Sequence, residues 1–260
     1  MKTLPEVWPY GRPRALLTDL DDTVLDGGRL RSAVLGALES LQGAGIAVVA
    51  ITGRPASWAE MAAHQWPLFG AIAENGAIAY RRVGARVVEH DDAPRLLRAE
   101  RCDRLNALTQ ELSLAFPELE PATDSRGRIS DRAWDIGENA HVAPEVVLRV
   151  RRFLEERGAK TAQSSIHVHA TFERHDKATG ALAFLARELE LDPAAALATV
   201  PFIGDSGNDR PCFSAFERSV GVANIDAHLG ALVRTPRFRT QSARSEGFLE
   251  LSRALLASAP

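Results

Sequence analysis

Short runs of apolar residues alternate along this chain with segments in which apolar residues recur every three or four positions. Ala15-Leu16-Leu17 is typical of a buried strand, and Ile46 to Ile51 predicts a second one. The apolar residues between these two runs share one helical face: Val34, Leu35, Leu38 and Leu41. Alternation of strands with helices indicates parallel βαβ units, so we expect an α/β fold.

The next segment predicts a helix followed by a hairpin. Pro55 suits a helix start, and the residues after it place four side chains on one stripe: Trp58, Met61, Ala62 and Trp66. Such a stripe is more typical of core packing than of a sugar-binding platform. Asn75-Gly76 separates two apolar runs at residues 71–73 and 77–80, and both residue types tolerate positive φ, which favours a β-hairpin.

The pattern changes between residues 84 and 172. Charged helical stretches at Pro94–Phe116 and Pro144–Arg157 flank a strand-like segment at Asp131–Ile136. The alternating run Ser165 to His169 places its serine and both histidines on one face of a further strand. This grouping of helices and strands predicts an inserted α+β unit.

The earlier alternation resumes after this insert. Ala178 to Leu191 is helical, apolar strands follow at Thr199–Ile203 and Val220–Ala223, and Glu246–Leu256 predicts a final helix. We therefore expect a Rossmann-like, doubly wound parallel sheet core with an inserted α+β cap domain. The expected bounds are residues 1–83 and 173–260 for the core and 84–172 for the cap.

Composition narrows the classes of function. The 260 residues include 31 basic and 34 acidic side chains, the net charge is −3, and no long basic run is present, so no nucleic-acid partner is expected. No apolar run approaches the ~20 residues that span a bilayer, and the proline-rich start does not resemble a signal peptide. We interpret Cys102 and Cys212 as free thiols and expect a cytoplasmic protein with no membrane partner.

The sequence Asp19-Leu20-Asp21-Asp22-Thr23 directly follows the first predicted strand. Ligands of open α/β sheets bind at the carboxyl ends of the strands, so carboxylates there can converge on one ligand. Asp19 can attack a phosphoryl group, and Asp21 can protonate the leaving oxygen and later deprotonate water. A turn with a helix cap remains the alternative interpretation.

A second acidic cluster follows another apolar strand, at Gly204-Asp205-Ser206-Gly207-Asn208-Asp209. Asp205 and Asp209 lie one helical turn apart, and such carboxylates suit Mg²⁺ together with water and a substrate phosphate. A glycine-rich turn capped by an aspartate is the structural alternative. Because both clusters follow strands, we expect Asp19, Asp21, Asp205 and Asp209 to meet around one Mg²⁺ ion.

Four carboxylates facing a phosphate repel one another unless cations are added. Mg²⁺ and one lysine would nearly balance them before the substrate binds. Lys177 is the best candidate because it lies at a predicted helix N-terminus, where the helix dipole disfavours a cation. A solvated surface lysine is its ordinary alternative.

Thr52, Gly53 and Arg54 also follow a predicted strand. The Thr52 hydroxyl and the Gly53 N–H can bind phosphate oxygens, and glycine permits close backbone approach. A simple turn explains threonine and glycine equally well, and an ion pair explains Arg54.

Taken together, these motifs resemble those of the haloacid dehalogenase superfamily of phosphohydrolases, in the expected order. The insert resembles the C2B-type cap of subfamily IIB, which contains the Cof-like proteins, phosphatases of sucrose, trehalose and mannosyl-glycerate phosphates, and phosphomannomutases. The resemblance implies that Asp19, the Asp21 carbonyl and Asp205 bind Mg²⁺ with support from Asp209, and that Thr52 and Lys177 hold the phosphoryl group. Asp22 departs from the family pattern, which often has glycine there.

The cap supplies candidate contacts to the substrate. The face that carries Ser165, His167 and His169 can point at a sugar, although solvent exposure is the ordinary explanation. The His-x-His pair also raises a zinc site, but no third ligand has convincing spacing. By the resemblance, the strand at residues 131–135 lines the substrate pocket. The candidate substrate-binding residues are Thr23, Gly53, Arg54, Asn208, Asp131, Arg132, Ser165 and His167.

These residues favour a Mg²⁺-dependent phosphomonoesterase that acts on a small phosphorylated metabolite, a sugar phosphate above all, through an aspartyl phosphate. Two alternatives remain open: a sugar phosphomutase and a non-catalytic phosphate-binding module. The sequence leaves the oligomeric state open, and a monomer is compatible with it.

Overall fold

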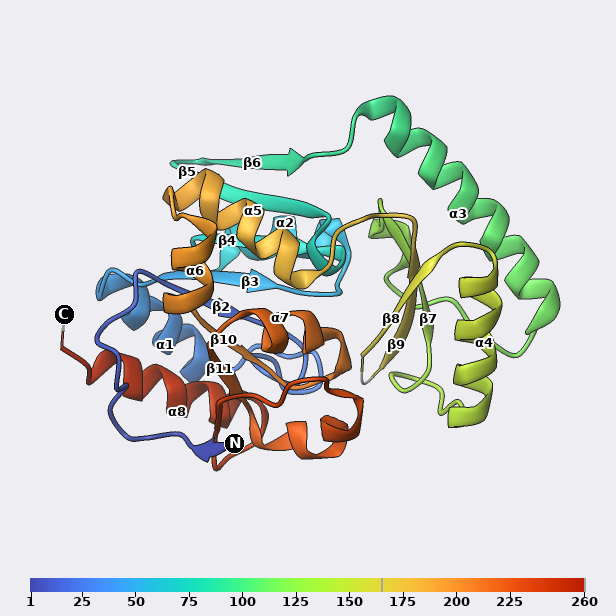
Figure 1. The fold of residues 1–260 in the computed structure, drawn as a ribbon. Coiled ribbons are helices and arrows are strands. Elements are labelled where there is room, and N and C mark those ends of the chain that lie inside the picture. The colour runs from blue at the N-terminus through green and yellow to red at the C-terminus, as the bar shows by residue number, and fades with distance from the viewer. Residues whose placement is uncertain (165, 260) are drawn as a thin grey trace.

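The computed structural model describes residues 1–164 and 166–259, and its largest element is a nine-stranded sheet in the order β1-β12-β11-β10-β2-β3-β4-β5-β6 (Figure 1). The strands are β1 (Lys2–Thr3), β2 (Ala15–Thr18), β3 (Ala47–Ile51), β4 (Gly70–Ala73), β5 (Ile78–Val83), β6 (Arg86–Asp91), β10 (Pro201–Gly204), β11 (Arg218–Gly221) and β12 (Phe238–Arg239). Neighbouring strands from β1 to β4 are parallel, whereas β5 and β6 are antiparallel. The predicted α/β core is confirmed.

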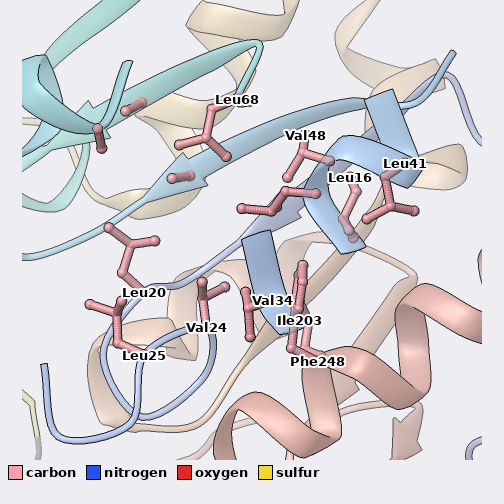
Figure 2. Close-up of a cluster of buried hydrophobic side chains, with 14 of the residues drawn as sticks. Leu16, Leu20, Val24, Leu25, Val34, Leu41, Val48, Leu68, Ile203 and Phe248 are labelled. Carbon is pink, nitrogen blue, oxygen red and sulfur yellow. The ribbon is translucent and has the colours of Figure 1, made fainter. Parts of the chain in front are cut away.

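Helices cover both faces of this sheet because side chains of its strands alternate between two apolar clusters. The first cluster contains Leu16 of β2 and Val48 of β3, whereas the intervening Leu17 and Val49 belong to the second. The first face is covered by α1 (Ser32–Gly43), α2 (Ala56–Gln65) and α8 (Arg244–Leu256), and the second by α5 (Lys177–Leu189), α6 (Pro193–Thr199) and α7 (Arg210–Ala215). Figure 2 shows the first cluster, where Val34 of α1 and Phe248 of α8 meet the sheet.

A second, three-stranded antiparallel sheet has the order β7-β9-β8, and Figure 1 shows it beside the carboxyl ends of the core strands. Its elements are β7 (Asp131–Asp135), β8 (Lys160–Gln163), β9 (His167–Thr171), α3 (Arg95–Ala115) and α4 (Pro144–Glu156). Trp134 and Val168 on one face of this sheet pack into an apolar cluster with α3 and α4. Trp134 is therefore a core residue, and the opposite face of the sheet is turned toward the core domain.

Most predicted elements are present, with three differences. Strand β6 pairs with β5, so the core sheet extends to Asp91, past the boundary expected at residue 83. Strand β8 was not predicted because Lys160–Gln163 is short and half-polar. In α2 the buried side chains are alanines 56, 59, 62 and 63, whereas Met61 of the predicted stripe is 39% exposed.

The hairpin predicted at Asn75-Gly76 connects β4 to β5 through a short 3-10 turn, η1 (Glu74–Gly76). Asn75 and Gly76 have φ of 54° and 111°, as their residue types permit. Three further 3-10 segments are η2 (Ser125–Gly127), η3 (Gly207–Asp209) and η4 (Ala223–Ala231).

Two further predictions concern cysteines and membranes. Both cysteines are free: Cys102 is half-buried on α3, and Cys212 is fully buried on α7. Within the described residues, every helix is too short or too polar to cross a bilayer.

Candidate active site

Three neighbouring strands bring the predicted motifs together. β2 lies between β10 and β3 and is parallel to both, so the carboxyl ends of all three strands lie at one edge of the sheet. Asp19 follows β2, Asp205 follows β10 and Thr52 follows β3. β2 has β3 on one side and β10 on the other, so the order in which the chain adds strands reverses at β2. Open α/β sheets bind ligands at such a reversal.

Lys177 bridges the two acidic motifs. Its Nζ lies 2.5 Å from Oδ1 of Asp19 and 2.7 Å from Oδ1 of Asp209, and the lysine is fully buried at the first turn of α5. The other carboxylate oxygen of Asp209 accepts the backbone N–H groups of Asp205 and Ser206 at 2.9 and 3.1 Å. Both carboxylate oxygens of Asp209 are therefore used in hydrogen bonds, one to Lys177 and the other to the loop after β10.

The buried acids are not balanced by this single lysine. Burial raises the pKa of Asp19 to about 8, although the ammonium of Lys177 opposes the shift. Burial and the charge of Asp19 also raise the pKa of Asp205 well above its ordinary value. Burial alone would lower the pKa of Lys177, but the carboxylates of Asp19 and Asp209 outweigh it and raise that pKa. The cluster therefore favours a further cation.

The donor set fits a hard divalent cation. Carboxylate oxygens of Asp19, Asp205 and Asp209 lie within 4.8 Å of one another, and all three residues are buried. Because Asp209 is already engaged, the oxygens available to a metal belong to Asp19 and Asp205. Nδ2 of Asn224 donates to Asp205 at 2.9 Å and to the Asp22 carbonyl at 3.1 Å, so it fixes both acidic loops. Oxygen donors of this kind suit Mg²⁺.

Arg54 binds the carboxylate of Asp21. Its Nε lies 2.9 Å from Oδ2 and its Nη2 lies 2.7 Å from Oδ1, which makes a two-point ion pair. The guanidinium lies 4.9 Å from the ring centre of Trp58. Arg54 therefore holds the side chain of the predicted acid and base, a role that the sequence left open between substrate contact and ion pair.

Thr52 and Gly53 lie in the loop after β3, directly before Arg54. The fully buried Thr52 hydroxyl accepts the backbone N–H of Arg54 at 3.0 Å. A Cβ atom on Gly53 would lie 3.3 Å from the ring of His169, which comes from β9 of the other sheet. A side chain at position 53 would therefore press on the ring of His169 unless that ring shifts by a few tenths of an ångström.

A buried chain of charged groups holds His169 in this position. Its Nδ1 lies 2.9 Å from Oδ2 of Asp131, and Asp131 in turn is 2.9 Å from Nη1 of Arg128. Arg128 also donates to the Gly53 carbonyl at 3.0 Å. Burial opposes ionisation of Asp131, but Arg128 and His169 outweigh it and lower its pKa to about 2. The three-stranded sheet and the loop after β3 are therefore connected by hydrogen bonds between charged and polar groups.

His167 lies next to this chain. Its Nε2 is 3.1 Å from Glu138, which itself lies 3.8 Å from Arg54. Burial, with the neighbouring charge of His169, lowers the pKa of His167 to about 4, so the ring is neutral near pH 7. The histidine face thus points at the acidic site and not at solvent. Within the described residues, the metal-binding candidates are the aspartates, so the zinc alternative has no support.

Glu74 ties the linker before β7 to the core. Its carboxylate accepts the backbone N–H groups of Ala56, Ile129, Ser130 and Asp131, and also the Ser130 hydroxyl. Ala56 begins α2, so one buried side chain caps a core helix and fixes the cap linker. Burial raises the pKa of Glu74.

A small pocket of about 10 Å³ joins the predicted groups. It is lined by Asp19, Asp21, Gly53, Arg54, Ser164, His167, His169, Asp205, Ser206 and Asn208. Three of the predicted substrate contacts within the described residues do not line it. Thr23 is fully buried, and Arg132 points to Cys102 and Asn106 of α3 because it lies on the other face of β7. Asp131 binds Arg128 and His169 and lines a neighbouring cleft instead. Ser165 lies outside the described residues.

Sequence reasoning did not find Glu74, Arg128, Glu138 or Asn224, and it named His169 only as a member of a polar face. The partners of Glu74, Glu138 and Asn224 at the site are far away in sequence, so spacing carries no signal for these pairs. Arg128 pairs with Asp131 three residues on, but its contact with the Gly53 carbonyl is equally distant in sequence. Asn224 is the exception, since it follows the apolar strand at Val220–Ala223 and thus lies at the edge where the other motifs were expected.

Comparison with known proteins agrees with this geometry. A family model described as sucrose-6F-phosphate phosphohydrolase matches residues 12–250. No curated protein gives a significant match.

Solved structures share the fold at low sequence identity. A protein of Thermoplasma acidophilum is 20% identical with a TM-score of 0.69, over 94% of this chain and 99% of its own. The sucrose-phosphatase of Synechocystis sp. PCC6803, in complex with sucrose and phosphate, is 20% identical with a TM-score of 0.67, over 94% and 98%. The C-terminal domain of the C. albicans trehalose-6-phosphate phosphatase is 12% identical with a TM-score of 0.66, over 96% and 93%.

Proposed function

This chain belongs to the sucrose-6F-phosphate phosphohydrolase family of haloacid dehalogenase-type phosphatases, and on that premise we propose that it is a Mg²⁺-dependent phosphomonoesterase of a small sugar phosphate. The observation that carries the proposal is the buried contact of Lys177 with Asp19 and Asp209 beside Asp205. It supports a nucleophile, a charge-balancing lysine and a cation site in one place.

In this proposal Asp19, Asp205 and the Asp21 carbonyl would hold Mg²⁺, and the ion would supply positive charge to neutralise the phosphoryl oxygens. Asp19 attacks phosphorus through its side-chain oxygen, and the bond from phosphorus to the leaving oxygen breaks. Lys177 orients Asp19 and offsets its charge. The Thr52 hydroxyl and Gly53 N–H bind the transferred group.

Asp21 acts as the acid and base. It protonates the leaving oxygen in the first step and removes a proton from water in the second, which releases inorganic phosphate and regenerates Asp19. Arg54 positions its carboxylate, as the two-point ion pair supports. His169 and His167 face the reacting group from the cap and contact the substrate.

We further propose that the chain divides into a core domain and a cap domain, with the first boundary after β6. The cap covers the reacting group and selects the sugar. The three-stranded sheet beside the carboxyl ends of β2, β3 and β10 supports this division (Figure 1).

The proposal predicts release of inorganic phosphate from at least one member of a sugar phosphate panel that includes sucrose 6F-phosphate. Activity should be lost with EDTA and restored by Mg²⁺, because the aspartates cannot otherwise be neutralised. Asp19→Asn should lower kcat about a thousandfold or more, since the nucleophile is removed. Phosphate release and phosphorylated isomers are both measured.

Asp103→Asn is the matched control, because Asp103 is exposed on α3 away from the site. It should leave kcat unchanged. Isomer formation without phosphate release would indicate a mutase, and a panel without turnover would exclude the phosphatase assignment.

A further inference from the structure

A larger cleft of about 340 Å³ lies beside the small acidic pocket. Ser164, His169 and Asn208 line both spaces, so these residues form a shared wall. If the phosphoryl group binds beside Asp19, the leaving group extends past His169 into this cleft. Its volume is within the range of small-molecule sites.

Both walls of the cleft carry basic side chains. Arg151 of α4 and Lys160 of β8 line it on the cap side, and Arg210 at the start of α7 lines it on the core side. His175 and His228 add two further basic groups on the core side.

The acidic residues that line the cleft are already committed. Glu74 accepts four backbone N–H groups, and Asp131 binds Arg128 and His169. The Asp176 carboxylate accepts the N–H and the hydroxyl of Thr179 at the start of α5. The carboxylates that line the cleft are therefore hydrogen-bonded without the side chains of Arg151, Lys160 and Arg210.

The basic residues keep free donors. The Arg210 side chain is exposed, lines the cleft and has no hydrogen bond or ion pair with the rest of the described chain. Arg151 uses Nε for Thr161 at 3.1 Å, and its Nη2 reaches Glu155 only at 3.6 Å. Lys160 gives one donor to the Arg174 carbonyl at 2.9 Å, and an ammonium has three.

We propose, on the basis of the phosphatase function above, that the leaving group of the natural substrate carries a second anionic group, which Arg210 and Arg151 bind. A carboxylate and a phosphate share the required chemistry, since both accept paired N–H groups from a guanidinium. A neutral disaccharide leaves these donors unpaired, so the cleft selects against it.

The test compares substrates that differ in the charge of the leaving group. Glucose 6-phosphate is the neutral case, 6-phosphogluconate adds a carboxylate, glucose 1,6-bisphosphate adds a phosphate, and sucrose 6F-phosphate is a neutral disaccharide. We expect kcat/KM to be at least about tenfold higher for one anionic case than for either neutral one. The better of the two anionic substrates identifies the group.

Arg210→Gln and Arg151→Gln should each lower kcat/KM about tenfold for the preferred anionic substrate and less than about twofold for glucose 6-phosphate. Arg253→Gln is the matched control, because Arg253 is exposed on α8 and away from the cleft. It removes the same charge and should change neither value. Thermal unfolding of each variant verifies the fold.

Equal kcat/KM for neutral and anionic substrates, or equal losses in both cleft variants for all substrates, would overturn the charge inference and leave the phosphatase function intact. Absence of phosphate release from every substrate would instead overturn the phosphatase function, and the charge inference with it.

Discussion

At the scale of single residues, the backbone angle φ of Asp22 explains why this position accepts an aspartate where the family pattern often has glycine. Asp22 has φ of 52°, in the left-handed region where glycine is unstrained and aspartate is among the better-tolerated alternatives. Its carboxylate lies 3.2 Å from Nε of Arg244, which offsets part of its charge. Its charge still helps to raise the pKa of Asp205, after burial and the charges of Asp19 and Asp209. The aspartate thus keeps the loop geometry and adds some negative charge near the pocket.

Two substitutions at this position test the interpretation. Asp22→Gly should change the free energy of unfolding by less than about 1 kcal/mol, because it relieves strain and loses only a partly exposed ion pair. Asp22→Val should cost about 1–2 kcal/mol, since a branched side chain is disfavoured at this angle. Urea denaturation measures both, and equal effects would contradict the role given to φ.

Sequence patterns predicted that the acidic residues and Lys177 lie at one edge of the sheet, because each is next to a recognisable strand or helix. They did not predict the direction in which each side chain points. Arg132 and Asp131 are adjacent, yet one turns to α3 and the other to the active site. That outcome depends on which face of β7 packs on the helices, and the local pattern of a five-residue strand does not specify it.

At the scale of elements, two glycines set how closely α5 approaches the η1 turn. A Cβ atom on Gly180 would lie 2.3 Å from the backbone oxygen of Gly76, a distance that only a backbone shift can relieve. The contact places the N-terminus of α5, and with it Lys177, against the hairpin after β4 (Figure 1).

Gly180→Ala should therefore destabilise the protein by about 1–3 kcal/mol, as overpacking does elsewhere. Gly36→Ala is the matched comparison, because Gly36 is exposed within α1 and a Cβ there meets nothing within 4 Å. It should stabilise the helix by about 0.5–1 kcal/mol. Thermal or urea unfolding distinguishes the two, and the same sign for both would refute the packing argument.

The alanine face of α2 has a similar cause. Small side chains let this helix lie close to β4 and β5, so the larger Trp58 and Met61 are displaced toward the edge and solvent. Helical periodicity predicted the helix but assigned the large apolar side chains to its buried face. Periodicity does not encode the distance between helix and sheet, which here admits only alanines.

The connection between Asp131 and Arg128 should depend on pH. The folded-state pKa of Asp131 is depressed to about 2, so its contribution to stability is present above the unfolded value near 3.9 and is lost as pH falls toward 2. Asp131→Asn should cost about 2 kcal/mol at pH 6, because it removes one of the two carboxylates that bind the buried Arg128, while Asp124 keeps its own contact.

This cost should shrink below pH 4, because the unfolded chain binds a proton at Asp131 there, whereas the folded protein stays ionised until the pH approaches 2. Urea denaturation of wild type and Asp131→Asn at pH 6, 4 and 3 measures the difference. A difference that stays constant over this range would show that ionisation of Asp131 does not stabilise the fold.

At the scale of the whole molecule, the two sheets are closed onto each other. The acidic pocket of about 10 Å³ lies between them. The hydrogen bonds of Glu74 hold the linker before β7 against the core, so they restrain one of the connections between the two sheets.

Glu74→Gln should weaken that restraint, because an amide replaces one acceptor oxygen with a donor. Hydrogen exchange at the amides of Ile129, Ser130 and Asp131 should become about tenfold faster. Amides of β2 serve as the internal reference and should be unchanged. Uniform acceleration in both places would indicate global destabilisation instead of local opening.

The arrangement of the core could be predicted at this scale because its inner strands β2, β3, β4 and β10 are each marked by a short apolar run. The outer elements could not be predicted equally well. Strand β6 is mostly exposed, and its pairing with β5 comes from the neighbouring strand and not from its own pattern.

The unequal burial of the two cysteines gives the natural chain a built-in attachment point. Cys212 is enclosed among aromatic side chains of the core, whereas Cys102 is half-buried beside Arg132 on the outer helix of the smaller unit. A thiol-reactive fluorophore would therefore mark one position in an otherwise unaltered molecule. Changes in its emission during turnover would report movements of α3 and the three-stranded sheet relative to the core.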